Sequence, residues 1–154
     1  MLPVRRILFP TDFSEHAEYA WPYALTFAQE FGAEVHLLHV VAPPPRMAEA
    51  YAVNFDPEKM VQALTAEANT SMDHQVEAAK TCGLIFHREV RVGVDFREII
   101  DYARKHDVDL IVMATHGRTG LAHALLGSVA EKVVRKAPCP VLTIKPPSMT
   151  FVAP

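Results

Sequence analysis

Two hydrophobic periods alternate along this chain of 154 residues. Short apolar runs rich in branched side chains predict five strands, at 4–9, 34–41, 85–92, 108–114 and 140–144. Between these runs, apolar residues recur every three or four positions, which predicts four helices. This alternation is typical of an α/β domain, in which right-handed crossovers build a parallel sheet with helices on both faces. The mixed polarity of 85–92 indicates an edge or near-edge strand.

Capping residues set the expected start and end of the first helix. Candidate N-caps precede its apolar pattern at Thr11, Asp12 and Ser14. Pro22 lies within the pattern and is expected to kink a single helix. Gly32 follows the last apolar position and is expected to end the helix.

The next two helices carry comparable signals. Asp56 followed by Pro57 combines an acceptor cap with a proline at the first helical position. Gly83 suits the stop of this second helix. Asp95 and Glu98 have the spacing of a capping box, which predicts that Asp95 caps the third helix. The fourth helix is expected to begin around residues 127–128.

Composition and charge narrow the class of protein. The formal net charge is −3, which argues against nucleic-acid binding, because such proteins usually carry a clustered basic excess. Cys82 and Cys139 are too few for a disulfide framework and lack zinc-site spacing. The N-terminal segment lacks a signal-peptide pattern, and no run reaches the roughly 18–20 apolar residues that span a bilayer. We therefore expect a cytoplasmic protein with no membrane partner.

Candidate chemistry gathers at the ends of two predicted strands. The first strand ends in Pro10, Thr11 and Asp12, and the fourth is followed by residues 114–120, which contain two glycines. Ligands of open parallel sheets bind beyond the carboxyl ends of the strands, where the strand order reverses. Gly117 allows backbone N–H groups to approach a ligand. A phosphate is also favoured at the helix start near 127–128, where the Ser128 hydroxyl could donate to it.

The same residues also have structural readings. The glycines could serve turns and caps, Ser128 and Asp12 could be helix caps, and Arg118 could be a solvated loop residue instead of a phosphate ligand. The chain has neither the P-loop motif nor the dinucleotide fingerprint, so a phosphate site would be of another kind. His36 and His39 are three apart on a strand and point to opposite faces, so no metal site is predicted.

At this point the sequence resembles the universal stress protein family over nearly its whole length. The resemblance runs from ILFPTDFSEHAEYA through HLLHVV to VDLIVMATHGRTGLAHALLGSVAEKVVRKAPCPVLTIK. The ATP-binding branch of that family carries Gly, two residues, Gly, nine residues, and then Gly-Ser or Gly-Thr. Gly117 and the Gly127-Ser128 pair match this pattern, whereas Ala114 stands at the position of the first glycine.

The resemblance implies a Rossmann-like, adenine nucleotide alpha hydrolase-like fold, in which a five-stranded sheet has the order 3-2-1-4-5. It also implies a pocket for ATP, or for AMP or ADP, with Mg²⁺ as a further candidate. The implied pocket residues are Pro10, Thr11 and Asp12 against the adenine and ribose, Val40 beside the base, Met113 and Ala114 in the wall, and His116, Gly117, Gly127, Ser128 and Val129 around the ribose and phosphates.

The expected function is therefore that of a stress-response sensor or regulator that binds an adenine nucleotide. Ligand-dependent ordering of 42–55 and 115–126 would be read out by a second copy, since the resemblance implies a homodimer through 140–144. The domain is expected to occupy 1–146, followed by a frayed tail at 147–154. Two alternatives remain: an interaction or protective protein of this fold without a nucleotide, and a slow ATPase. No catalytic residue is assigned, because no nucleophile or base with an orienting partner is recognisable.

Overall fold

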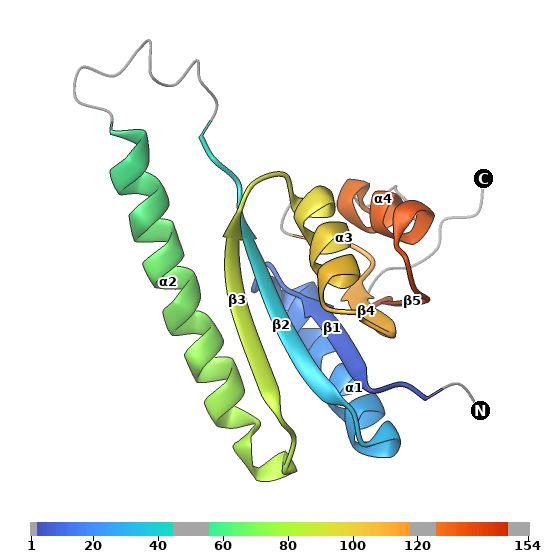
Figure 1. Cartoon of the computed structure of the whole chain (residues 1–154). Coiled ribbons are helices and arrows are strands. Elements are labelled where there is room, and N and C mark those ends of the chain that lie inside the picture. The colour runs from blue at the N-terminus through green and yellow to red at the C-terminus, as the bar shows by residue number, and fades with distance from the viewer. Residues whose placement is uncertain (1–2, 45–55, 118–125, 148–154) are drawn as a thin grey trace.

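The sheet is the centre of the molecule. The computed structural model describes residues 3–44, 56–117 and 126–147. Five parallel strands form one sheet with the order β3-β2-β1-β4-β5, which confirms the predicted fold class. The strands are β1 (Arg6–Pro10), β2 (Glu34–Val41), β3 (Phe86–Val92), β4 (Leu110–Ala114) and β5 (Val141–Ile144). β3 lies at one edge of the sheet, as the mixed polarity of its sequence predicted (Figure 1).

The strands β1 and β4 begin two residues later than their apolar runs predicted. The reason is a side chain: the Asp109 carboxylate accepts hydrogen bonds from the backbone N–H groups of Arg5 and Arg6, at 2.8 and 2.9 Å. This carboxylate joins the two chain segments at the start of their strands, beside a backbone hydrogen bond from the Asp109 N–H to the Arg6 carbonyl at 3.0 Å. The prediction for β2 agrees with the structure at both ends.

The helices are α1 (Glu15–Phe31), α2 (Pro57–Ala78), α3 (Asp95–Lys105) and α4 (Ser128–Lys136), with a short 3₁₀ helix, η2, at Lys80–Cys82. The structure confirms that α1 is one helix with Pro22 inside it and that Ser14 is its N-cap. Gly32 ends α1 in the left-handed conformation, with φ of 63°, as predicted. Asp56 caps α2, since its carboxylate accepts from the N–H groups of residues 58 and 59.

Three expected helix ends are wrong. Gly83 ends η2 and not α2, whose C-cap is Ala79. Val94, not Asp95, is the N-cap of α3, and no side chain caps that helix. Glu98 does not reach back to complete a capping box, because its carboxylate lies 3.5 Å from the Arg91 guanidinium of β3. The structural reading of Ser128 as an N-cap also fails, since Gly127 is the N-cap of α4 and Ser128 is its first residue.

Helices cover both faces of the sheet and give it two cores (Figure 1). On one face, α1 presents a row of small residues at Ala17, Ala20, Ala24 and Ala28, which lets the helix approach the sheet closely. On the other face, α3 and α4 pack residues such as Ile99 and Val133 against Leu8 and Leu38. Alternate residues of β1 therefore belong to different cores, which is the period of two expected of a doubly covered strand.

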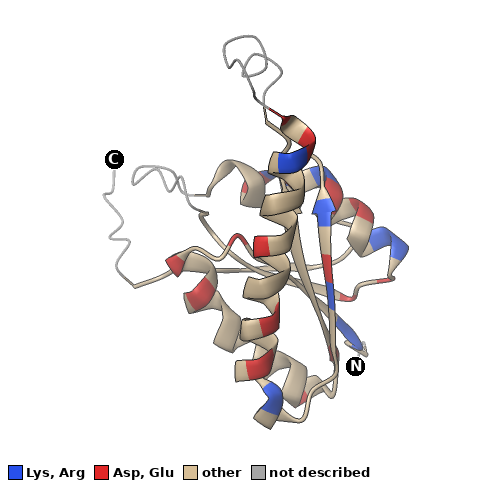
Figure 2. Ribbon diagram, turned by 90° about the vertical axis from the view of Figure 1, so that its left-hand side faces the viewer, with Lys and Arg blue, Asp and Glu red and all other residues tan. Residues whose placement is uncertain are grey.

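Charge is distributed unevenly between the helices. α1 contains Glu15, Glu18 and Glu30 but neither Lys nor Arg. Figure 2 looks onto α2, along which acidic positions recur from end to end. The last turn of α4 carries Arg135 and Lys136.

Among the described residues, no helix is long and apolar enough to span a membrane. The expected tail falls largely on 148–154, which lie outside the described residues.

Candidate functional site

A cavity of about 620 Å³ opens at the carboxyl ends of β1, β2 and β4, where the strand order reverses. This volume is within the usual range for small-molecule sites, roughly 300–1,000 Å³. The structure brings eleven of the predicted site residues together in its lining: Pro10, Thr11, Asp12, Val40, Met113, Ala114, His116, Gly117, Gly127, Ser128 and Val129. The twelfth, Arg118, lies outside the described residues. The ligand contacts of all twelve remain predictions.

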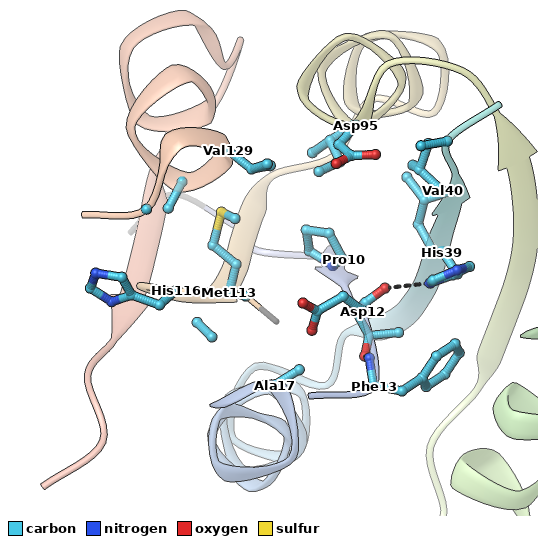
Figure 3. A pocket seen from close by; sticks show the side chains of 18 of the residues that line it. Pro10, Asp12, Phe13, Ala17, His39, Val40, Asp95, Met113, His116 and Val129 are labelled. Atoms are coloured by element: carbon cyan, nitrogen blue, oxygen red, sulfur yellow. Dashed lines mark hydrogen bonds between the residues drawn. The ribbon is translucent and has the colours of Figure 1, made fainter. Parts of the chain in front are cut away.

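Asp12 lies in the middle of this pocket (Figure 3). Its Oδ1 atom accepts from both the N–H and the hydroxyl of Ser14, at 3.1 and 2.6 Å, so the carboxylate also braces the N-cap of α1. A Cβ atom at Gly117 would lie 2.5 Å from Asp12 Oδ2. A side chain at this position would therefore have to displace the Asp12 carboxylate from its place beside Ser14.

Gly127 holds the start of α4 against the end of β4. Its N–H donates to the Thr115 carbonyl at 2.8 Å, and a Cβ here would lie 3.1 Å from that same carbonyl oxygen. α4 therefore begins beside the pocket, and no side chain caps its first turn among the described residues. Free N–H groups at a helix start attract anions, so this wall is the electropositive part of the pocket.

The β2 side of the pocket contains two residues that the sequence did not single out as ligand candidates. His39 Nδ1 lies 2.8 Å from the Thr11 carbonyl oxygen (Figure 3). The ring of Phe13 packs against the His39 ring, with centroids 4.8 Å apart. Phe13 has φ of 58°, which is rare for a bulky residue and costs on the order of 1–3 kcal/mol. This backbone conformation places the Phe13 ring in the lining of the cavity, beside His39.

Asp95 is a second carboxylate in the pocket and was assigned by sequence to a helix cap instead. It stands at the first position of α3 and lines the cavity, above Asp12 in the view of Figure 3. Burial is the main cause that raises the pKa of Asp95 above its ordinary value, and the charge of Asp12 adds to it. No ligand-binding motif marks this residue, because its place in the pocket depends on where α3 meets β2.

The remaining wall comes from α2, whose predicted apolar face is only partly used for the core. Leu64, Glu67 and Ser71 line the cavity from this helix.

His116 is buried, and its Nδ1 lies 3.1 Å from the Thr115 hydroxyl. In Figure 3 its ring lies on the side of the pocket remote from His39, which fits a residue that faces a ligand mainly with its backbone.

The strand order and the position of this pocket define a Rossmann-like α/β domain of the adenine nucleotide alpha hydrolase-like class. The family model for the universal stress protein family matches residues 3–145, and the chain belongs to that family.

Individual relatives agree with this assignment. Universal stress protein MJ0531 of Methanocaldococcus jannaschii is 38% identical over 143 residues, which cover 93% of this chain and 83% of the relative. The solved structure of protein MJ0577, from the same organism, matches with a TM-score of 0.80 at 34% identity and covers 96% of this chain and 99% of the other.

Two more distant structures carry a nucleotide. A universal stress protein in complex with cAMP has a TM-score of 0.63 to this chain, 24% identity, and coverage of 93% of this chain and 98% of the other. The universal stress protein of Archaeoglobus fulgidus in complex with dAMP has a TM-score of 0.64, again at 24% identity, and covers 94% and 100%. At this identity the two structures establish a shared fold.

Proposed function

We propose that this protein binds ATP, or a related adenine nucleotide such as ADP or AMP, and acts as a stress-response sensor. The observation that carries the proposal is the pocket itself. It joins an aromatic and apolar wall, formed by His39 and Val40 of β2 and by Phe13 after β1, to the start of α4, where no described side chain caps the helix. Family members of the same fold that were solved with cAMP and dAMP support the choice of an adenine nucleotide.

Charge orients the proposed ligand. Asp12, Asp95 and Glu67 place carboxylates on the β1, α3 and α2 walls, where they would repel phosphates and accept from hydroxyl or amino groups. The start of α4 is the wall that favours anions. The adenine and ribose therefore lie toward Val40 and His39, and the phosphates lie toward Gly127 and Ser128.

Mg²⁺ fits the same arrangement. This ion prefers oxygen ligands and is usually held by one or two carboxylates together with substrate phosphates. Asp12 and Asp95 both line the cavity. Burial is the main cause that raises the pKa of Asp95, and the charge of Asp12 adds to it. Either carboxylate would hold the ion beside the phosphates of a bound nucleotide and offset part of this unfavourable charge.

A homodimer that pairs through β5 would transmit the effect of nucleotide binding from one copy of the chain to the other. β5 is the free edge of the sheet opposite β3, and Val141, Leu142 and Thr143 on it are only partly buried. Exposed edge strands readily pair with a second copy. Light scattering with and without ATP tests this part of the proposal, and a monomer at every concentration of protein and nucleotide would refute it.

Calorimetry with adenosine, AMP and ATP tests the nucleotide site. We expect AMP to bind about tenfold more tightly than adenosine, since a charge at a helix start contributes up to about 2 kcal/mol. Ser128→Ala should weaken AMP and ATP but leave adenosine unchanged, because only the phosphates reach α4.

The matched control is Ser71→Ala, which removes a hydroxyl from the α2 wall of the same cavity. It should affect adenosine and ATP equally or not at all. Absence of heat with millimolar ATP would refute the proposal and favour a protective protein of this fold that binds no nucleotide. Ala114→Gly examines the one departure from the family motif, and we expect tighter binding, since its methyl group lies in the cavity wall.

A slow ATPase is tested in the same samples. Phosphate release that Asp12→Ala abolishes while ATP binding persists would assign hydrolysis to this pocket, because positioned phosphate and Mg²⁺ need little further chemistry. Equal phosphate release by the parent protein and Asp12→Ala would assign the activity to a contaminant.

A further inference from the structure

A cluster of potential metal ligands lies at the amino-terminal ends of β2 and β3. Glu34 and His36 are two apart on β2, so their side chains share one face of the sheet. His87 on β3 is the register partner of His36 and lies on that same face. One ligand atom from each of the three residues lies within 4.8 Å of the other two.

Within the cluster, His36 and His87 stack with ring centroids 4.5 Å apart. His87 Nε2 lies 2.9 Å from Glu34 Oε2, a separation close to that of two ligands on one small ion. Glu34 and His87 are roughly half exposed, so their side chains can turn toward an ion that enters from solvent. His36 is the fixed member, with only 5% of its surface exposed.

One ring nitrogen of the buried His36 side chain lacks a hydrogen-bond partner among the described residues. Its Nδ1 atom lies 2.8 Å from the Tyr102 hydroxyl, whereas its Nε2 atom has no hydrogen-bond partner among the described residues. Leaving a buried polar atom unpaired costs about 1–3 kcal/mol, so such an atom usually has a partner. A histidine that ligates a metal through one nitrogen commonly bonds a second group through the other, which is the arrangement of Tyr102 and His36.

We propose that Glu34, His36 and His87 form a binding site for a divalent transition metal ion, with Zn²⁺ as the matching ion. Two imidazoles and one carboxylate are a known zinc donor set that leaves a fourth position for water. Zn–N and Zn–O bonds of about 2.0–2.2 Å require the ligand atoms to move closer by small rotations of the exposed Glu34 and His87. For His87 to ligate through Nε2, its ring carries its proton on Nδ1, and the ion takes the place of the hydrogen bond between Nε2 and Glu34.

The Tyr102 hydroxyl that orients His36 is itself held in place. The Arg91 guanidinium lies 4.9 Å from the centre of the Tyr102 ring, and the His106 ring stacks on the same ring with centroids 4.1 Å apart. The buried His36 ring is therefore fixed by its surroundings, whereas Glu34 and His87 are free to adjust to an ion.

This site is distinct from the nucleotide pocket. His36 is four residues upstream of Val40 on the same strand, a separation of roughly 13 Å at the usual rise. None of the three proposed ligands lines the pocket. The inference therefore stands or falls independently of the proposed nucleotide function.

Titration of the full chain with Zn²⁺, followed by calorimetry and by the shift in melting temperature, tests the site. We expect one equivalent to bind and to raise the melting temperature, because the ion binds the folded chain. Glu34→Gln and His87→Gln each remove a ligand at a half-exposed position and should weaken Zn²⁺ binding by more than about 100-fold. Tyr102→Phe removes the positioning hydroxyl and should weaken it by about 10- to 100-fold.

Two controls separate this site from adventitious binding. His74→Gln removes an exposed histidine of α2, and a double Cys82→Ser, Cys139→Ser variant removes both thiols. Both controls should bind Zn²⁺ as the parent protein does. Loss of binding in either control, or unchanged binding in His87→Gln and Glu34→Gln, would overturn the proposal, as would a parent protein whose melting temperature Zn²⁺ does not raise.

Discussion

The two ends of the sheet are built in different ways. At the carboxyl end, loops and helix starts converge on a cavity, and its residues come from segments that follow strands. At the amino end, the Glu34, His36 and His87 cluster lies on the strands themselves and depends on which residues pair across β2 and β3. The first kind of site leaves a trace along the sequence as glycines and caps. The second kind leaves none, since its ligands are 53 positions apart for Glu34 and His87.

The same contrast appears in how the two sites manage charge. In the pocket, Asp12 and Asp95 both line the cavity, and the start of α4 provides a wall that favours anions. In the cluster, a buried imidazole lies beside a half-exposed carboxylate and a half-exposed imidazole. The pocket therefore suits an anionic ligand that is accompanied by a cation, whereas the cluster suits a metal cation alone.

The largest expected effect concerns the core that both ends share. Leu37 on β2 is fully buried, and Leu37→Ala should lower the free energy of unfolding by about 2–5 kcal/mol. Ile85 precedes β3 with 59% of its surface exposed, so Ile85→Ala should change stability by no more than about 0.5 kcal/mol. Urea denaturation measures both, and equal losses would show that β2 is not the rigid element that holds the two ends apart.

A smaller effect examines the packing at the carboxyl end. Gly117→Ala should cost about 1–3 kcal/mol, because the added methyl group displaces the Asp12 carboxylate that Ser14 anchors. In an Asp12→Ala background the same change should cost much less. A double-mutant cycle measures this coupling, and strictly additive losses would mean that Gly117 is needed for another reason.

Asp95 should affect stability through its charge. Because its folded pKa is raised, its protonated form stabilises the fold at low pH, and this contribution is lost as pH rises through the folded pKa. Asp95→Asn should therefore melt at a higher temperature than the parent at pH 7, and the gain should fade toward about pH 4. Glu30→Gln, an exposed amide control on α1, should show no such trend. A constant gain across the pH range would contradict the electrostatic cause.

The smallest expected effect is an absence of coupling between the two ends. Glu34→Gln should leave the dissociation constant for ATP unchanged, and Asp12→Ala should leave that for Zn²⁺ unchanged. Sites this far apart are usually additive within about 0.3–0.5 kcal/mol. Calorimetry on both variants measures the coupling, and a shared change of tenfold or more would join the two ends into one regulated system.

The sequence predicted those features whose causes are local. The strand at 34–41 and the cap at Gly32 were correct, because alternation and a left-handed stop depend on neighbouring residues. The strand order and the meeting of the 10–12 and 114–117 segments came from family resemblance together with the rule for open sheets. Eleven predicted residues consequently lie in one cavity.

What the sequence missed depends on tertiary placement. Asp95 was predicted to be the N-cap of α3. It is instead the first residue of that helix, and it lines the pocket. The sequence around Phe13 gave no sign of its positive φ, because bulky residues rarely adopt this conformation. His36 and His39 were correctly assigned to opposite faces, yet His87 could be paired with His36 only once the register of β2 and β3 was known.

A crystal structure grown with ATP and Mg²⁺ tests the central claim most directly. We expect the purine beside Val40, the phosphates at the N–H groups of Ser128 and Val129, and the cation within reach of Asp12 or Asp95. An empty pocket at saturating ATP, or a nucleotide bound elsewhere on the chain, would contradict it.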